Sequence, residues 1–199
     1  MKYVISGTNR PKSRSREVAN LIQEIYADNG ESVEIIDLAE LGLHELDGSQ
    51  YGGASLPLKL ASALEKINQS EGLIIVVPEY NGSMPGALKY FIDHWKYPDS
   101  FEHRPVCLVG LGGLFGGLRP VEHLQGVLGY RNAFIFPIRV FLINVWTILK
   151  AGKLSEPVAL GLLKDQVLGF QKFVFALGQV GLDANTLNAK RAGKSSAPI

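Results

Sequence analysis

The sequence has few of the features that mark several large classes of protein. A single cysteine stands among 199 residues, so no disulfide can form within the chain, and this favours a reducing compartment. The 20 basic and 19 acidic residues nearly cancel to a net charge of +1. Such a balance gives no reason to expect nucleic acid or an anionic membrane as a partner.

Long apolar runs are also missing. The most apolar stretch, residues 134–149, is interrupted by Pro137, Arg139 and Asn144, and it is shorter than the ~20 apolar residues that span a bilayer. The first six residues pass directly into a polar loop, without the apolar core of a signal peptide. We therefore expect a cytoplasmic protein.

Several catalytic patterns are absent as well. The histidines, His44, His94, His103 and His123, are scattered without metal-ligand spacing, so we expect no metal site. No Gly-x-Ser-x-Gly elbow, Walker A loop or Gly-x-Gly-x-x-Gly fingerprint occurs, and Ser83 has no evident base. We expect no catalytic side chain. An enzyme with this sequence would take its chemistry from a cofactor.

What the sequence contains is a regular alternation of apolar runs and helical periodicity. We expect strands at residues 3–5, 33–37, 73–77, 106–111 and 133–136. Helices are expected at 15–28, after Pro57, at 86–95, at 118–128 and within 157–182. The pattern predicts a three-layer α/β domain over residues 1–182, with a five-stranded parallel sheet in the order 2-1-3-4-5. The polar residues 183–199 are interpreted as a disordered tail.

The loop from Gly7 to Ser15 joins the first strand to the first helix. Free backbone N–H groups and the helix dipole favour an anion at such a position. Thr8, Ser13 and Ser15 add hydroxyl groups and Arg10 adds a charge, which together fit a phosphate monoester. An ordinary polar loop is an equal alternative, with Ser15 as the helix cap and the basic side chains in solvent.

Two further loops follow the third and fourth strands. The second loop, residues 79–85, presents mostly main-chain polar groups, which suit the edge of a flat heterocycle, or it is a tight turn around Asn81-Gly82. The third loop, residues 110–117, is rich in glycine, so its backbone can approach a ligand closely, or it is a flexible turn. Residues 140–149 are unusually apolar, and we interpret them as a subunit interface or a cover over the substrate.

Two motifs together resemble a known family. Gly7-Thr8-x-Arg10-x-x-Ser13-x-Ser15 and the run Pro78-Glu79-Tyr80-Asn81-Gly82-Ser83-x-Pro85-Gly86 are similar to those of NAD(P)H-dependent FMN reductases. That family includes quinone, azo-dye and chromate reductases with a flavodoxin-like fold. The resemblance implies FMN as cofactor, NADPH or NADH as electron donor, and a homodimer or homotetramer. The cofactor-binding residues that it implies are Thr8, Arg10, Ser13, Ser15, Pro78, Glu79, Tyr80, Asn81, Gly82, Ser83, Gly112, Gly113 and Gly116.

We interpret the chain as an FMN-dependent NAD(P)H oxidoreductase. By ping-pong chemistry it would pass electrons to a quinone, an azo compound, free flavin or a similar small oxidised acceptor. A flavodoxin-like electron carrier or flavin-binding sensor without turnover is the rival, although small carriers are typically acidic and this chain is near neutral. A crevice protein without flavin is a third interpretation. The donor stays open, because Arg10, Lys12 and Arg14 can each reach an extra phosphate or can all serve FMN.

Overall fold

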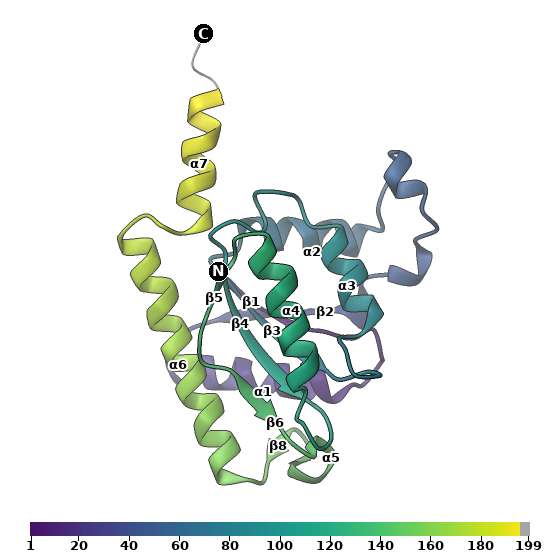
Figure 1. Cartoon of the computed structure of the whole chain (residues 1–199), viewed down its shortest axis with the longest axis vertical. Helices are drawn as coiled ribbons and strands as arrows, with labels where there is room; N and C mark the ends of the chain where they lie inside the picture. The colour runs from purple at the N-terminus through teal and green to yellow at the C-terminus, as the bar shows by residue number, and fades with distance from the viewer. Residues whose placement is uncertain (196–199) are drawn as a thin grey trace.

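The computed structural model describes residues 1–195 and has a parallel sheet at its centre (Figure 1). The strand order is β2-β1-β3-β4-β5, which confirms the predicted order. Every pair in this sheet is parallel, with Ile5 of β1 opposite Ile36 and Ile75. The strands are β1 (Lys2–Ser6), β2 (Val33–Asp37), β3 (Gly72–Pro78), β4 (Pro105–Leu111), β5 (Phe134–Ile135) and β6 (Val140–Leu142).

The last strand of the sheet is interrupted. β5 pairs with the start of β4 and β6 pairs with its end, so two segments on either side of Pro137 form the edge of the sheet, and only β5 lies within the strand expected at 133–136. The side chain of Gln166 bridges the gap, donating hydrogen bonds of 2.9 Å to the carbonyl oxygens of Leu108 and Ile138. Part of the expected apolar segment 140–149 is therefore a strand of the sheet.

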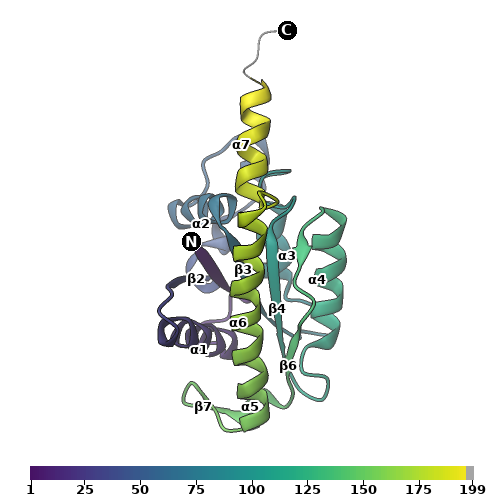
Figure 2. The same cartoon turned by 90° about the vertical axis from the view of Figure 1, so that its left-hand side faces the viewer.

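Helices cover both faces of the sheet, as a run of strands buried on both sides requires. One face packs against α2 (Leu58–Gln69), α3 (Gly86–Asp93) and α4 (Leu118–Tyr130). The other face packs against α1 (Arg14–Asp28) and the long α6 (Pro157–Gln179) (Figure 2). Along β3, odd-numbered residues such as Ile75 enter the first core and even-numbered ones such as Val76 enter the second. This alternation confirms three layers.

Short elements complete the chain. Three 3₁₀ helices, η1 (Leu38–Glu40), η2 (Leu43–Glu45) and η3 (Ser49–Gly52), occupy the glycine-rich excursion after β2. A small helix, α5 (Val145–Ile148), follows β6 and leads into an antiparallel hairpin of β7 (Leu149–Lys150) and β8 (Lys153–Leu154). Along residues 1–195, no helix is long and apolar enough to cross a membrane.

Residues expected to belong to a disordered tail instead form α7 (Ala184–Ser195), which extends beyond the layered body (Figures 1 and 2). Polar side chains hold its base. Asn185 donates to the carbonyl oxygen of Gln69 at 3.0 Å, and Asn188 donates to that of Asp99 at 3.0 Å. The buried guanidinium of Arg104 donates to the side-chain oxygen of Asn185 at 3.1 Å. The remainder of the expected tail, residues 196–199, lies outside the described residues, and the domain boundary at 182 stays a prediction.

The single cysteine is buried inside the second core. Burial raises the pKa of the Cys107 thiol well above its ordinary value, so the thiol stays protonated and unreactive at neutral pH. Burial, together with the nearby Cys107, also raises the pKa of the Tyr26 phenol. The Tyr26 hydroxyl has no hydrogen-bond partner in the part of the chain that the structure describes. Both side chains therefore act as core groups.

Candidate functional site

The loops that follow β1, β3 and β4 meet at the carboxyl ends of the strands, where open α/β sheets bind ligands. A cavity of about 160 Å³ opens between them. Since ~300–1,000 Å³ is usual for a pocket that encloses a drug-sized molecule, this cavity holds only part of such a ligand. It is lined by Arg10, Lys12, Ser13, Arg14, Ser15, Pro78, Glu79, Tyr80, Leu111, Gly112, Val145 and Trp146.

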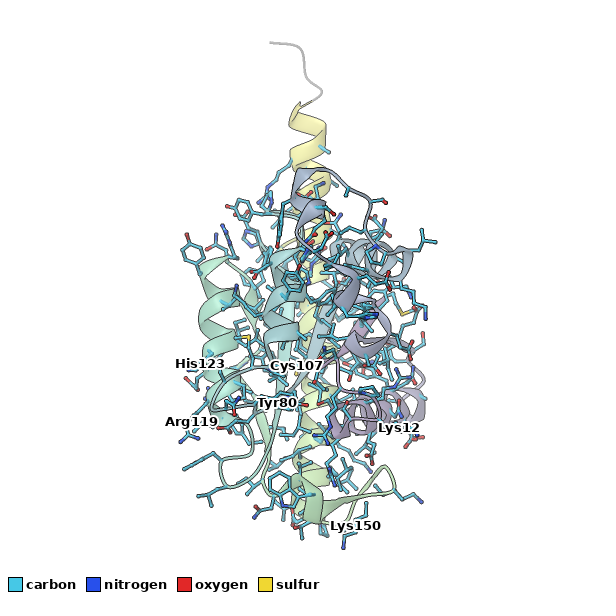
Figure 3. The ribbon with its side chains drawn as sticks, turned by 90° about the vertical axis from the view of Figure 1, so that its right-hand side faces the viewer. Lys12, Tyr80, Cys107, Arg119, His123 and Lys150 are labelled. Atoms are coloured by element: carbon cyan, nitrogen blue, oxygen red, sulfur yellow. The ribbon has the colours of Figure 1, made fainter. Side chains whose placement is uncertain are left out.

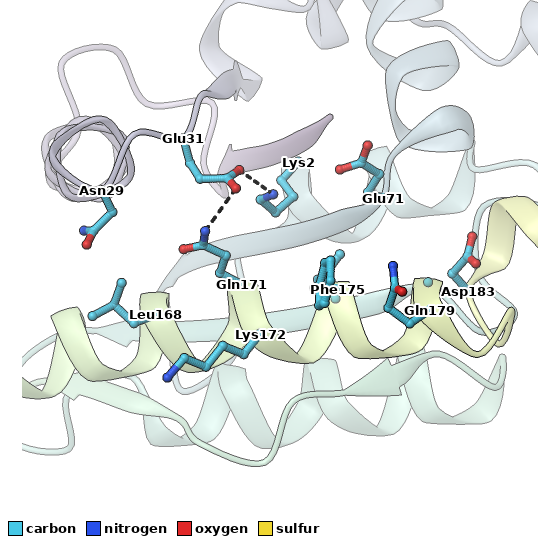
Figure 4. A pocket seen from close by; sticks show the side chains of 12 residues that line it. Lys2, Asn29, Glu31, Glu71, Leu168, Gln171, Lys172, Phe175, Gln179 and Asp183 are labelled. Atoms are coloured by element: carbon cyan, nitrogen blue, oxygen red, sulfur yellow. Dashed lines mark hydrogen bonds and ion pairs between the residues drawn. The ribbon is translucent and has the colours of Figure 1, made fainter.

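A larger cavity of about 700 Å³ lies at the other end of the sheet, between the start of β1 and α6 (Figure 4). Its central polar groups bind one another. Glu31 accepts hydrogen bonds from Lys2 at 3.0 Å and from Gln171 at 3.0 Å. None of the three predicted loops contributes to its lining. We therefore place the candidate site in the smaller cavity.

The three predicted hydroxyl groups of the first loop differ in what they do. Thr8 is fully buried; its hydroxyl accepts from the backbone N–H of Arg10 at 3.3 Å and donates to the Tyr80 hydroxyl at 3.1 Å. Ser13 caps α1 by accepting from the N–H of Arg16 at 3.2 Å, so the cap is Ser13 and not Ser15. Ser15 lines the cavity with 1% exposure, and its hydroxyl has no hydrogen-bond partner within residues 1–195. Ser15 is thus the hydroxyl left for a ligand.

Gly7 fixes the path of this loop. Its N–H donates to the carbonyl oxygen of Val76 at 2.9 Å, which joins the first loop to β3. A Cβ at this position would lie 2.7 Å from the same oxygen, closer than packed atoms allow. Gly7 is required because two backbones approach each other here.

Basic side chains surround the cavity on the side of the first loop. Arg10, Lys12 and Arg14 are exposed, and no ion pair is found for them within residues 1–195. Arg16, one turn further along α1, is by contrast paired with Asp37 at 3.3 Å. The start of α1 therefore combines a helix dipole with uncompensated positive charge.

The second loop is a tight two-residue turn. Tyr80 and Ser83 exchange backbone hydrogen bonds of 2.9 and 3.1 Å. Asn81 and Gly82 between them have positive φ angles of 50° and 76°, as a type I′ turn requires. The turn expected as a local alternative is thus present. These two residues and Ser83 lie outside the cavity lining, whereas Pro78, Glu79 and Tyr80 form part of it.

Two residues of α4 contact the second loop, and sequence reasoning did not assign them to the site. Arg119 forms an ion pair of 2.9 Å with Glu79. His123 lies 2.8 Å from the Ser83 hydroxyl, so Ser83 does have a hydrogen-bonded histidine. Figure 3 shows both residues on the side of Tyr80 opposite Lys12. Their spacing of four residues at the start of the helix after the glycine loop is the signal that could have found them.

The glycine loop packs closely against neighbouring segments of the chain. Gly112 lines the cavity. A Cβ on Gly113 would lie 3.1 Å from the Trp146 ring, and one on Gly116 would lie 2.9 Å from the Ile143 side chain. The glycines at 113 and 116 thus let the segment after β6 pack closely. This packing carries Val145 and Trp146 of α5 into the cavity wall.

The residues of the cavity suit a phosphate ester. A buried hydroxyl without a partner, free N–H groups at a helix start and uncompensated cations are the donors that an anionic oxygen needs. Among the described residues, no group of three or more His, Cys, Asp or Glu side chains could hold a metal ion. The donor set therefore fits the phosphate end of a nucleotide cofactor such as FMN.

Comparisons with known proteins point the same way. The family described as NADPH-dependent FMN reductase matches residues 3–147. The chain is 29% identical over 175 residues to a quinone reductase of Escherichia coli (strain K12), covering 84% of this chain and 92% of the relative. It is 30% identical over 124 residues to an FMN-dependent NADPH-azoreductase of Staphylococcus saprophyticus, covering 61% and 65%. The flavoenzyme NAD(P)H:acceptor oxidoreductase FerB of Paracoccus denitrificans has the same fold, with a TM-score of 0.69 at 19% identity over 88% of this chain and 97% of FerB.

Proposed function

The chain belongs to the NADPH-dependent FMN reductase family, and from this we propose that it reduces quinones or azo compounds, with the residues of the described cavity holding FMN. When bound, FMN supplies the two-electron chemistry that links the nicotinamide donor to the acceptor. The protein contributes position, hydrogen bonds and charge.

The first loop would bind the cofactor's phosphate. The observation that carries this assignment is the Ser15 hydroxyl, which is buried in the cavity wall without a hydrogen-bond partner among the described residues. Leaving such a group unpaired costs about 1–3 kcal/mol, so it is a natural donor to an incoming oxygen anion. Arg10 and the N–H groups at the start of α1 would complete the phosphate site. Thr8 and Ser13 would act indirectly, by holding the loop and capping the helix.

The second loop would position the ring end of the cofactor. The hydrogen bond between Tyr80 and Thr8 ties this loop to the first, so that the phosphate end and the ring end are held at a fixed separation. Glu79 follows Pro78 in this loop, and its ion pair with Arg119 holds the Glu79 side chain in place. Val145 and Trp146 also line the cavity, and the buried Val145 would help to exclude water from the ring.

The test begins with the purified protein. We expect it to bind FMN, and the bound flavin to lose its visible absorbance when NADPH is added without an acceptor and without oxygen. Adding a benzoquinone or an azo dye should then restore the absorbance with turnover. FMN binding without bleaching would indicate an electron carrier or sensor. Failure to bind FMN would refute the proposal.

We further propose that the protein is a homodimer or homotetramer. Four large apolar side chains beside the site are 39–74% exposed: Leu114, Phe115, Leu118 and Ile143. The glycine loop and the segment after β6 contact each other at Gly116, so these side chains belong to adjoining segments. Exposed apolar patches of this kind are typical of protein interfaces. The expected cytoplasmic location also stays a prediction.

A further inference from the structure

The first loop carries more positive charge than one phosphate monoester requires. Such a phosphate has a charge of about −1.5 to −2 at neutral pH. Ser15, the N–H groups at the start of α1 and Arg10 already supply a hydroxyl, a helix dipole and one cation. Lys12 and Arg14 remain beside the same cavity, exposed and without an ion pair in the described part of the chain. In a chain of net charge +1, this local excess is a specific feature.

An exposed aromatic side chain lines the same cavity as these cations. Trp146 lines the cavity, and its side chain is 55% exposed. A Cβ on Gly113 would lie 3.1 Å from the six-membered ring, so the glycine loop packs closely against this part of the indole. An exposed indole is a stacking surface for a purine base. A purine and a second phosphate are therefore each matched by side chains that line one cavity.

On the other side of Tyr80 the polar groups are already occupied. Arg119 is paired with Glu79 and lies over the Phe115 ring, 4.4 Å from its centroid. His123 is hydrogen-bonded to Ser83. Figure 3 shows Lys12 on the opposite side of Tyr80 from Arg119 and His123. An additional phosphate would find uncompensated charge only on the Lys12 side of the described site.

We propose that Lys12, Arg14 and Trp146 form the subsite for the adenosine 2′-phosphate half of NADPH. Lys12 and Arg14 bind the 2′-phosphate, and Trp146 stacks on adenine. This subsite rests on the proposed function and assigns the preference for NADPH over NADH to named residues. The first loop would then bind two phosphates with different residues. Ser15 and Arg10 bind the phosphate of FMN, and Lys12 and Arg14 bind the 2′-phosphate of the donor.

The test compares two variants of the FMN-loaded protein. Adenosine 2′,5′-bisphosphate and 5′-AMP are titrated by calorimetry, and kcat/KM is measured with NADPH and NADH. In the double variant Lys12→Gln, Arg14→Gln, we expect affinity for the bisphosphate and kcat/KM for NADPH to fall about tenfold or more, because two charge-assisted contacts are lost. Values for 5′-AMP and NADH should change by less than about twofold.

Trp146→Leu should lower the affinity for both nucleotides and leave the preference between them unchanged. Loss of stacking should weaken the bisphosphate and 5′-AMP by a similar factor of about five or more, leaving the ratio between them unchanged. The double variant Lys164→Gln, Lys172→Gln removes two exposed charges of α6 and controls for net charge. It should behave like the unsubstituted protein in every titration.

Several results would overturn the subsite. One is a wild-type protein that binds the two nucleotides equally. A second is a double variant at Lys12 and Arg14 that keeps the wild-type preference for NADPH over NADH and for the bisphosphate over 5′-AMP. A third is a double variant in which FMN affinity falls at least tenfold while the preference stays, because the cations would then serve the flavin phosphate. Each of these leaves the proposed function standing, since that function fails only if the unsubstituted protein does not bind FMN or is not bleached by NADPH.

Discussion

Replacing Ser15 with alanine tests the phosphate site most directly, because it should move two quantities in opposite directions. Ser15 is 1% exposed, and its hydroxyl has no hydrogen-bond partner in the described chain without a ligand. An unsatisfied buried hydroxyl costs about 1–3 kcal/mol, so its removal should leave the FMN-free protein equally stable or up to ~1 kcal/mol more stable. For a chain of this size, a gain of ~1 kcal/mol corresponds to a rise in Tm of roughly 2–4 °C.

The same substitution should weaken FMN binding. A hydroxyl that donates to a phosphate makes a charge-assisted hydrogen bond worth about 1.5–3 kcal/mol, so the Kd should rise roughly 10- to 150-fold. Equilibrium dialysis or flavin fluorescence measures the Kd, and calorimetric melting of the FMN-free protein measures Tm.

Ser13→Ala is the matched control, two residues away on the same loop. The Ser13 hydroxyl caps α1 at 3.2 Å from the Arg16 nitrogen, so its loss should destabilise the FMN-free protein by about 1 kcal/mol. FMN affinity should fall less than in Ser15→Ala, since the Ser13 hydroxyl is already in use. The reasoning is refuted if Ser15→Ala lowers the Tm of the FMN-free protein and leaves the Kd of FMN unchanged.

Three further predictions concern the loop, the core and the exposed patch. Gly7→Ala places a Cβ 2.7 Å from the Val76 carbonyl oxygen, so we expect the first loop to shift and FMN affinity to fall at least tenfold; a variant that binds FMN normally would contradict this. Because the pKa of Tyr26 is raised in the folded protein, the unfolded chain loses a proton above pH ~10 that the folded protein keeps. The free energy of unfolding should therefore fall as pH rises, and this group contributes a slope that approaches about 1.4 kcal/mol per pH unit. Urea unfolding at pH 8.5 and pH 10.5 should show a smaller drop for Tyr26→Phe, and an equal drop would exclude Tyr26 as the cause. Ile143→Asp should lower the molecular mass measured by light scattering, whereas Leu58→Asp, at an even more exposed apolar residue on α2, should not; an unchanged mass for Ile143→Asp would argue against the interface.

The fold was largely predictable because its signals are local. The run at residues 73–77 is apolar on both faces, and the alternation of strands and helices leaves a parallel sheet as the natural arrangement. The split of the fifth strand was not predictable in detail. It depends on Gln166, which lies far along the chain and satisfies a carbonyl oxygen of β4 that the interruption leaves without a strand partner.

Helix α7 shows where composition misleads. Its polar residues resemble a disordered segment, since they offer little apolar surface to bury. Asn185 and Asn188 instead satisfy carbonyl oxygens at the end of α2 and before β4, and Arg104 joins them from the core side. Such contacts cannot be inferred from the spacing of residues within the helix, because their partners are 81 to 116 residues away.

The sequence by itself determined the architecture and the three loops that form the site, because a strand followed by a loop and a helix places its loop at a known edge of the sheet. Only the tertiary structure decided which hydroxyl of the first loop is free. Thr8 donates a hydrogen bond to Tyr80, Ser13 caps α1, and of the three only Ser15 has no hydrogen-bond partner among residues 1–195. Hydrogen-bond partners depend on distances between segments far apart in the chain, so residue type and spacing could suggest three candidates but could not rank them.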